Sequence, residues 1–482
     1  MAYGHEATST VKVAILNISG VSGSLVINEN IYAGGLKGNL TNTTSSTVAS
    51  AAVNIDNATL KNVYGEGALM SQPQGDGTPW VYESSGDKVF TKLGITNVEA
   101  GTVKILDGSV SLRAEDTKQT KITESLTVGE NVPVTLSTDG TTNDFYEGDI
   151  TKAIIINGWT EEDYLKAQSI EMDEGLVLGA TSLVDGKLVR KANVTNTEIS
   201  NLLTNLPVLQ IRTEMNDLRK RLGDVRAAEG VNGAWARYDG GKMSGKGLDN
   251  DFHKLQIGFD TAVNNAWRLG GALSYTKGDV DGQKTSADTD SYSLAAYGVW
   301  SGEKGQFVDV IARVAKLDTE LNARTFSGKK LDQTGLSLSG EFGWRFDLSN
   351  TVYVEPTVEA TYTYIDSESF KAQYAKFKLD STDSLMTKVG VSAGLKCPNN
   401  KGDLYVRAGL VHEFLGDSKL TTSMEGYQTA IKADGKDTWV EYAIGAQYNV
   451  NKNTYIYADV ERTGGAKIDE DWRANVGLRY AF

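Results

Sequence analysis

The sequence predicts an all-β protein: a twelve-stranded transmembrane β-barrel with an α-helix in its pore, preceded by a β-solenoid-like fragment. Three observations predict this fold class. Residues 231–482 alternate between apolar and polar side chains in long segments rich in aromatic residues. Residues 205–229 carry the only long helical pattern in the chain, and residues 1–195 show short strand-like runs separated by glycine and asparagine. A lone helix between two β regions is best explained as a plug inside the second region.

Composition excludes several classes of function. The 482 residues are enough for two or three domains. The net charge of −14 argues against nucleic acid as a partner, because nucleic-acid binding needs a basic surface. No stretch approaches the ~20 apolar residues of a transmembrane helix, which leaves strands that alternate in polarity as membrane-spanning candidates. The lone cysteine, Cys397, permits no intramolecular disulfide. The first ten residues lack a basic region and an apolar region, so no signal peptide is expected there.

Residues 1–195 predict strands and turns without helices. The strand-like runs include Val11–Ile18, Gly23–Ile27, Ala51–Ile55, Thr102–Ile105, Val110–Leu112 and Ala153–Ile156. Repeated strands and turns favour a β-solenoid or another all-β architecture. No fixed repeat length is present, so a parallel β-helix is one hypothesis among all-β folds. Residues 160–200 have mixed charge and no clear period.

The helix is predicted to span Asn205 to Glu229, inside a linker region of residues 196–230. Thr204 or Asn205 can cap it, and Pro207 then falls in the first turn, where proline is tolerated. Its apolar stripe is broken and most other positions are charged, with five basic and three acidic residues between positions 212 and 226. Such a helix is too polar for lipid or for an apolar core, and it suits a charged, partly hydrated channel.

Residues 231–482 are predicted to form the barrel. Of the 41 aromatic residues, ten precede residue 196, none lies in 196–230, and the other 31 follow. The twelve predicted strands are 232–239, 251–263, 266–278, 289–301, 305–318, 333–347, 351–366, 383–397, 402–415, 437–449, 453–463 and 472–482. Short connections (264–265, 301–304, 348–350, 398–401 and 450–452) alternate with long ones (near 240–250, 279–288, 319–332, 367–382, 416–436 and 464–471). This alternation is typical of outer-membrane barrels.

Aromatic placement distinguishes the barrel from a large β-sandwich, whose strands would also alternate. Many aromatic residues lie within a few residues of the short turns or of the C-terminus, where they are expected to form a girdle at the membrane boundary. The girdle candidates are Trp267, Trp300, Phe307, Trp344, Phe346, Tyr353, Tyr448 and Phe482. A β-sandwich with aromatic residues at random positions is the alternative.

The face opposite the apolar one is predicted to line the lumen with both signs of charge. Its charged residues are Asp309, Arg313, Glu341, Arg345, Glu355, Glu359, Arg407, Glu441, Asp459, Glu461, Arg473 and Arg479. A lumen of mixed charge suits a helix of mixed charge, so its carboxylates are expected to meet Arg219, Lys220 and Arg221. Alternatively, these charges only solvate the pore. Pro356 predicts a local kink, because proline removes a hydrogen bond from the sheet.

Several segments resemble autotransporters, the type V secretion proteins. They are GAWARYDGG at Gly233–Gly241, the strand with Glu355-Pro356, LVHEFLG at Leu410–Gly416, TWVEYAIGAQYNVNKNTYIYADVERTGG at Thr438–Gly465 and GLRYAF at Gly477–Phe482. The resemblance implies a twelve-stranded outer-membrane translocator that carries an N-terminal passenger, often a β-helix, to the cell surface. It also implies outer-membrane lipid and the barrel assembly machinery as partners. The aromatic ending with Tyr480 and Phe482 resembles the signal that this machinery reads.

The predicted helix has a resemblance of its own. TEMNDLRKRLGDVR, at Thr213–Arg226, is similar to the linker helix of the serine-protease autotransporters of enteric bacteria, in which two asparagines in the pore mark a self-cleavage site. The first asparagine corresponds to Asn216, and the second position holds Asp217, a departure from the pattern. The resemblance implies that the Asn216 side-chain amide attacks its own backbone carbonyl and releases the chain from Asp217 onward. Alternatively, Asn216 is an ordinary polar residue of an uncleaved plug.

No enzyme activity is expected beyond that single-turnover cleavage. The three histidines are His5, His253 and His412, and only His5 lies in residues 1–195, so a Ser-His-Asp triad there is not expected. The scarcity of histidine also argues against a zinc site, and no cofactor is predicted. Two other classes stay open. One is an outer-membrane barrel enzyme, and the other is a surface adhesin whose passenger binds an unknown host or cell-surface ligand.

Overall fold

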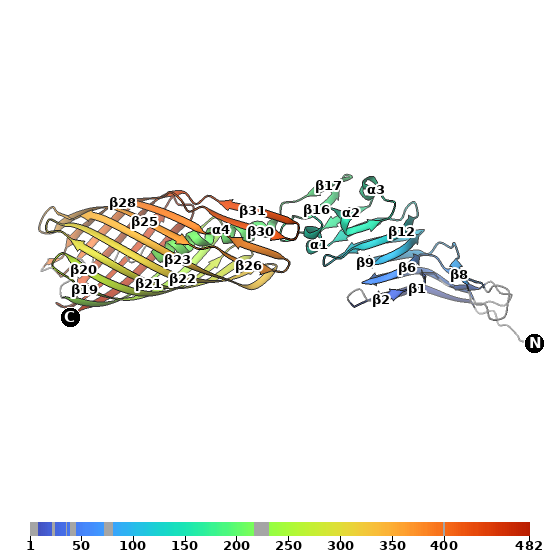
Figure 1. The fold of residues 1–482 in the computed structure, drawn as a ribbon, viewed down its shortest axis with the longest axis horizontal. Helices are drawn as coiled ribbons and strands as arrows, with labels where there is room; N and C mark the ends of the chain where they lie inside the picture. The colour runs from blue at the N-terminus through green and yellow to red at the C-terminus, as the bar shows by residue number, and fades with distance from the viewer. Residues whose placement is uncertain are drawn as a thin grey trace, which may run out of the picture. The chain divides into compact units, whose positions relative to one another are not determined.

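The computed structural model describes residues 8–21, 25–34, 36–38, 45–71, 81–215, 231–398 and 401–482. The chain divides into two compact units, Met1–Thr195 with Met424–Tyr427, and Asn196–Ser423 with Gln428–Phe482. Figure 1 shows the elements of both. Within the described residues, no helix is both long enough and apolar enough to span a membrane.

The N-terminal unit consists of short strands and three short helices. Its strands are β1 Thr8–Ser19, β2 Leu25–Ile27, β3 Ile31–Tyr32, β4 Leu36–Gly38, β5 Ser45–Asp56, β6 Ala58–Tyr64, β7 Ala68–Ser71, β8 Val81–Ser84, β9 Phe90–Thr96, β10 Glu99–Ile105, β11 Asp107–Ala114, β12 Thr120–Val128, β13 Val134–Thr138, β14 Ile154–Ile156, β15 Ser169–Met172, β16 Thr181–Val184 and β17 Lys187–Arg190. The helices are α1 Gly140–Phe145, α2 Ile150–Ala153 and α3 Glu161–Leu165. The expectation of a helix-free fragment is therefore wrong for residues 140–165. Asp139 and Asp149 begin α1 and α2 by accepting hydrogen bonds from the backbone amides of Thr142 and Thr151.

Parallel strand stacking makes this unit a β-solenoid. One sheet has the order β1-β5-β9-β11-β13-β15, all parallel, and continues through β16 and β17 in antiparallel pairing. A second parallel sheet has the order β14-β12-β10-β6-β2. The coils differ in length, since Val110 pairs with Val134 whereas Ala51 pairs with Thr91. Unequal coils explain why the sequence shows no fixed repeat.

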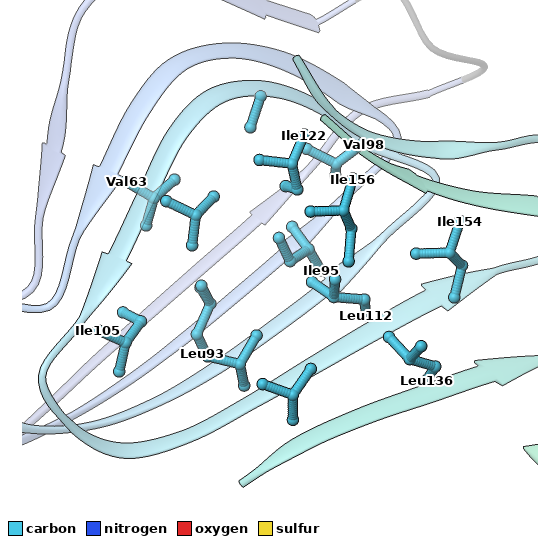
Figure 2. Close-up of a cluster of buried hydrophobic side chains, with 14 of the residues drawn as sticks. Val63, Leu93, Ile95, Val98, Ile105, Leu112, Ile122, Leu136, Ile154 and Ile156 are labelled. Atoms are coloured by element: carbon cyan, nitrogen blue, oxygen red, sulfur yellow. The ribbon is translucent and has the colours of Figure 1, made fainter. Parts of the chain in front are cut away.

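Aliphatic side chains in register form the core between the two sheets. In one sheet, paired positions form the row Ile55, Ile95, Leu112, Leu136 and Ile170. Facing it, the other sheet carries the row Leu60, Ala100, Ile122 and Ile156. All of these side chains are buried, and Figure 2 labels five of them: Ile95, Leu112, Leu136, Ile122 and Ile156. Each coil therefore contributes apolar groups that its neighbours cover, as in other stacked repeats.

The C-terminal unit contains a closed antiparallel barrel of twelve long strands. They are β18 Asn232–Gly245, β19 Leu248–Ala262, β20 Trp267–Asp281, β21 Thr285–Ser301, β22 Gln306–Ala323, β23 Phe326–Trp344, β25 Val352–Ile365, β28 Thr382–Lys396, β29 Gly402–Glu413, β32 Asp437–Asn449, β33 Thr454–Gly464 and β34 Asp469–Ala481. Neighbours in sequence pair in order, β34 pairs with β18, and the ring has no gap. The predicted twelve strands are confirmed.

The predicted long connections are largely strand instead of loop. Strands β18 and β19 pair up to Gly245 and Leu248 and turn through Lys246 and Gly247, both at positive φ, so the expected loop at 240–250 is a tight hairpin. The regions 367–382 and 416–436 fold into two further hairpins, β26 Glu368–Ala372 with β27 Ala375–Leu379, and β30 Ser418–Met424 with β31 Tyr427–Ala433. These four strands form a separate sheet. Both faces of a strand at a barrel rim can be polar. The polar composition of these segments therefore resembles that of loops, although they form strands.

Pro356 interrupts the wall on one side only. Strand β25 pairs with β28 through Pro356 without a shift in register. On its other side β23 stops pairing at Thr357, and the short strand β24, Phe346–Asp347, takes over at Val354. The position that lacks an N–H group therefore lies in a gap between two pairings, which is where a proline costs no ladder hydrogen bond.

The long helix α4 begins earlier than predicted. It spans Val194–Met215 rather than starting at Asn205, so Pro207 lies inside it. Serine, threonine and asparagine have low helix propensity, which hid its first turns in the sequence. In the structure their side chains bond back to the preceding turn: Thr204 Oγ1 donates to the Ser200 carbonyl and Asn205 Nδ2 to the Asn201 carbonyl, each at 2.7 Å. The predicted end at Glu229 lies outside the described residues.

Candidate functional site

The barrel wall presents an apolar outer face and a charged inner face. Along β19 the outward Leu255, Ile257 and Phe259 are about half exposed, whereas the inward Lys254 and Gln256 are buried. The charged residues predicted for the lumen fall on the inward face, opposite the exposed apolar positions of their strands. An apolar outer face requires lipid, and a charged inner face requires partners for its charges.

Many of the inward charges pair with one another along the wall. The Asp260 carboxylate accepts from Arg479 at 2.7 Å and from Arg268 at 2.8 Å. Arg407 lies 3.3 Å from Asp459 and 3.8 Å from Glu461. Several pairs combine residues of different strands, so the lumen is strongly polar while much of its charge is neutralised locally.

The helix α4 occupies the lumen (Figure 1). At one end of the barrel, the β18–β19 turn contacts it: Asn201 Nδ2 donates to the Lys246 carbonyl at 2.8 Å, and Lys246 Nζ donates to Asn205 Oδ1 at 3.1 Å. Strand β18 begins at the other end, where the Asn232 amide donates to the Phe482 carbonyl at 3.2 Å. The helix α4 therefore enters the lumen at the end of the barrel opposite the start of β18.

Glu214 joins α4 to one arc of the wall. Its carboxylate Oε2 accepts from Lys254 Nζ of β19 at 2.9 Å and lies 3.6 Å from Arg313 Nη1 of β22. The Ser291 hydroxyl of β21 donates to the other carboxylate oxygen. Glu214, Lys254 and Arg313 are all buried. A buried carboxylate with two cations and a hydroxyl donor is well satisfied, whereas losing one partner would leave a charge uncompensated.

Arg212 joins the same helical turn to a second arc. Its guanidinium donates to the Ile468 carbonyl, lies 3.5 Å from the Thr463 hydroxyl and stacks over the Trp439 ring, 4.7 Å from the ring centroid. The Arg212 carbonyl in turn accepts from Arg473 Nη2 at 3.0 Å. These partners lie on or between β32, β33 and β34.

Apolar and neutral contacts support these two charged sites. Ile211 packs with Ala315 and Leu317 of β22 and with Ile365 of β25. Gln210 Nε2 donates to the Thr319 hydroxyl of β22 at 3.2 Å. The helix α4 thus contacts the barrel wall in four successive turns, from Asn201 to Glu214. These contacts hold it inside the lumen.

The structure does not describe the cut-site candidates. Asn216 and Asp217, and also the basic residues Arg219, Lys220 and Arg221, lie outside the described residues, so self-cleavage and the predicted pairing of these cations stay predictions. The charged contacts that the structure does describe come from Arg212 and Glu214, for which the sequence analysis named no partner. The sequence did contain a signal for these contacts. Arg212 and Glu214 are charged residues on the same helix as the apolar positions that face the wall, so both could have been expected to need charged or polar partners there.

The terminal residues Tyr480 and Phe482 lie on the outward face of the last strand. Both are exposed, and their rings stack with centroids 6.1 Å apart. Phe259 of β19 lies 6.3 Å from Phe482. An exposed aromatic pair at the strand that closes the barrel is available to an external protein, and the role of an assembly signal stays a prediction.

The predicted aromatic girdle needs two corrections. Trp267, Phe346, Tyr448 and Phe482 are exposed, and Trp300 and Trp344 are half-buried near the short turns. Phe307 and Tyr353 instead point inward and are buried. They have the same parity as the lumen residues of their own strands, Asp309 and Glu355, and a strand places residues of one parity on one face.

Comparisons with known proteins find similar sequences for the barrel region. Residues 231–461 match the family model described as autotransporter β-domain. The serine protease EatA of Escherichia coli O78:H11 is 27% identical over 282 residues, covering 56% of this chain and 21% of EatA. The BrkA autotransporter of Bordetella pertussis is 26% identical over 289 residues, covering 56% of this chain and 28% of BrkA. The solved β-domain of a Bordetella BrkA is 22% identical with a TM-score of 0.43, covering 52% of this chain and 100% of that one.

The aligned stretches thus cover well under half the length of the curated relatives, and the family match falls on the barrel strands from β18 into β33. The stretch 231–461 of the barrel is therefore similar to the autotransporter β-domain.

Proposed function

We propose that the chain is an outer-membrane translocator that delivers or anchors its N-terminal solenoid, the passenger, at the cell surface. The observation that carries this proposal is the helix α4, which follows the solenoid in sequence and occupies the lumen of the closed barrel. The helix α4 meets the β18–β19 turn and β18 begins at the opposite end of the barrel, which fits a passenger that is joined to the barrel through the pore. A chain threaded in this way connects the two sides of a membrane.

The partners follow from the surfaces of the barrel. The outward aliphatic residues of the twelve strands fit outer-membrane lipid, and the exposed pair of Tyr480 and Phe482 fits recognition by the barrel assembly machinery. An unknown host or cell-surface ligand remains the expected partner of the passenger.

A surface adhesin whose passenger stays attached to an uncleaved barrel is the second candidate. The buried contacts of Arg212 and Glu214 favour attachment over release, because they bind the passenger side of α4 to the wall. Relatives such as EatA are described as serine proteases. Among the described residues, the histidines are His253 and His412, which lie in barrel strands β19 and β29.

Surface delivery is tested with the full chain exported by a fused signal peptide in a Gram-negative host. Protease added to intact cells is expected to digest the passenger and leave the barrel as a fragment that runs differently on a gel when boiled and unboiled. A chain that lacks β34, and so cannot close the barrel, serves as the control. A passenger that resists protease until the outer membrane is permeabilised would contradict the proposal.

The mass of the barrel isolated from membranes decides between the cleaved and uncleaved forms. Self-cleavage predicts a fragment that begins at Asp217 and that disappears in Asn216→Ala but persists in Asn201→Ala, a variant of an asparagine in α4. The adhesin candidate predicts the full-length chain alone.

A further inference from the structure

We propose that Arg212 and Glu214 form a two-sided clamp that keeps the passenger bound to the barrel even after the backbone is cut on the C-terminal side of Met215. This inference rests on the proposed role of the barrel as the carrier of the passenger. It adds a mode of attachment that needs no covalent bond. In this proposal, the lumen wall binds the C-terminal end of the passenger after the cut.

The first side of the clamp is the buried carboxylate of Glu214. Lys254, Ser291 and Arg313 come from three different strands, β19, β21 and β22, so the carboxylate links α4 to three strands of the wall at once. Lys254 Nζ also lies 3.3 Å from the Glu214 carbonyl, to which it donates. One lysine thus binds both the side chain and the backbone of the same residue.

The second side is Arg212 with its partners on β32 to β34. Residues two apart in an α-helix point about 200° apart around its axis, so Arg212 and Glu214 project to opposite sides of α4. The Arg212 side chain donates to the wall while its carbonyl accepts from Arg473, whose guanidinium is itself paired with Glu470 at 2.7 Å. A helix held from opposite sides can neither slide toward one arc nor rotate without breaking a buried contact.

The position of the clamp in the sequence determines what it retains. Both residues precede Asn216, the candidate cut site, so they remain part of the passenger after a cut there. The charges lie buried in the lumen, where an ion pair that loses its partner keeps the cost of desolvation. Withdrawal of the cut helix would separate the Glu214 carboxylate from Lys254 and Arg313 inside the lumen. Dissociation is therefore expected to be slow.

The test cuts the covalent link between passenger and barrel in the purified full chain and asks whether the two fragments stay bound. A protease recognition sequence is inserted between Gly230 and Val231; Val231 is exposed and precedes β18, so this cut severs everything before the barrel from residues 231–482. The chain carries an N-terminal affinity tag, is cut in detergent micelles and is captured on a resin. The barrel fragment is then followed over time in the bound and unbound fractions.

With the parent sequence, the barrel fragment is expected to stay with the captured passenger. Glu214→Gln or Lys254→Gln should release it roughly a hundredfold faster, since each breaks a buried pair. In the double variant, the increase in release rate should be smaller than the product of the two single increases, because both substitutions remove the pair of Glu214 with Lys254. Arg212→Gln tests the contacts of Arg212 with β32 to β34 independently. It also replaces the Glu214 variants in the test if they do not fold. Glu198→Gln, a glutamate of the same helix that is only half-buried, is the matched control and should behave as the parent.

Prompt release of the barrel fragment from the parent protein after cutting would overturn the clamp. Equal retention of the barrel fragment in the parent and in all variants would also overturn it, provided that the barrels of the variants are heat-modifiable and therefore folded. Neither result depends on surface delivery, which the protease experiment on intact cells measures separately.

Discussion

Inward-facing rings of the barrel wall lie against glycines of the neighbouring strand. Phe307 pairs with Gly343, Tyr353 with Gly394 and Tyr457 with Gly477. A Cβ atom added at Gly343 would lie 2.1 Å from the Phe307 ring, and one at Gly477 would lie 2.1 Å from the Tyr457 ring. These glycines are therefore required for space, because the ring fills the volume that a side chain would need.

This contact predicts that Gly343→Ala destabilises the barrel by about 1–3 kcal/mol, the usual cost of overpacking. The measurement is the temperature at which the barrel loses its faster gel mobility. Gly340→Ala on the same strand is the matched control, since nothing lies within 4 Å of the added Cβ there. Equal midpoints for the two variants would show that the Phe307 ring moves aside freely.

At the C-terminus, Phe482→Ala is expected to lower the yield of assembled barrel in cells. Phe482 is 58% exposed, so its loss removes little packing and chiefly removes a group available to an assembly factor. Tyr448→Ala, at an outward aromatic that is 49% exposed, controls for a general loss of membrane-boundary aromatics. The measurement is the heat-modifiable fraction in isolated outer membranes, and an unchanged fraction would contradict the signal role.

Among the elements, the solenoid coils are held by rows of paired aliphatic side chains. Ile122 of β12 is fully buried between Ala100 and Ile156 of the neighbouring strands. We expect Ile122→Ala to reduce the free energy of unfolding of the solenoid by about 2–5 kcal/mol, the cost of a core cavity. Ile155→Ala in the adjacent β14 removes the same atoms from a side chain that is 37% exposed, and should cost far less. Urea unfolding followed by tryptophan fluorescence measures both.

The barrel strands could be predicted because apolar and polar side chains alternate along each of them over many residues. Only one register places all of the apolar side chains on the outer face. In β34, for instance, Trp472, Val476 and Tyr480 all face outward, as their parity requires, and Arg473 and Arg479 face inward. Phe307 and Tyr353 lie near turns but point inward, because the parity of a residue along its strand, and not its distance from a turn, determines which face it occupies. Parity alone would have placed both correctly.

The helix was less predictable than the strands. Its first turns, from Val194 to Thr204, are rich in asparagine, serine and threonine, which favour caps and turns in isolation. Inside the barrel these side chains bond within the helix and to the wall, so tertiary contacts override local propensity. The same reason hid the site: the partners of Arg212 and Glu214 lie on strands far away in sequence, and no spacing within the helix reveals them.

At the scale of the whole molecule, two units with separate cores should unfold separately. The barrel pairs every long strand on both sides, whereas the solenoid sheet ends at β1 and β17, which have one neighbour each in that sheet. We expect urea to abolish the solenoid signal while the barrel keeps its faster unboiled mobility. Trp159 in the solenoid and the gel shift of the barrel report the two events on one sample. A single transition common to both probes would show that the units are coupled.

The ring of strands closes by joining its first member to its last, β18 to β34. A translation product that stops anywhere before residue 469 lacks β34 and leaves two rows of unpaired backbone groups, which lipid cannot satisfy. Such a product cannot form a sealed cylinder, however well its other strands pair. Closure therefore depends on the last strand to be synthesised, since only a chain that includes β34 can pair β18 and β33 on both sides.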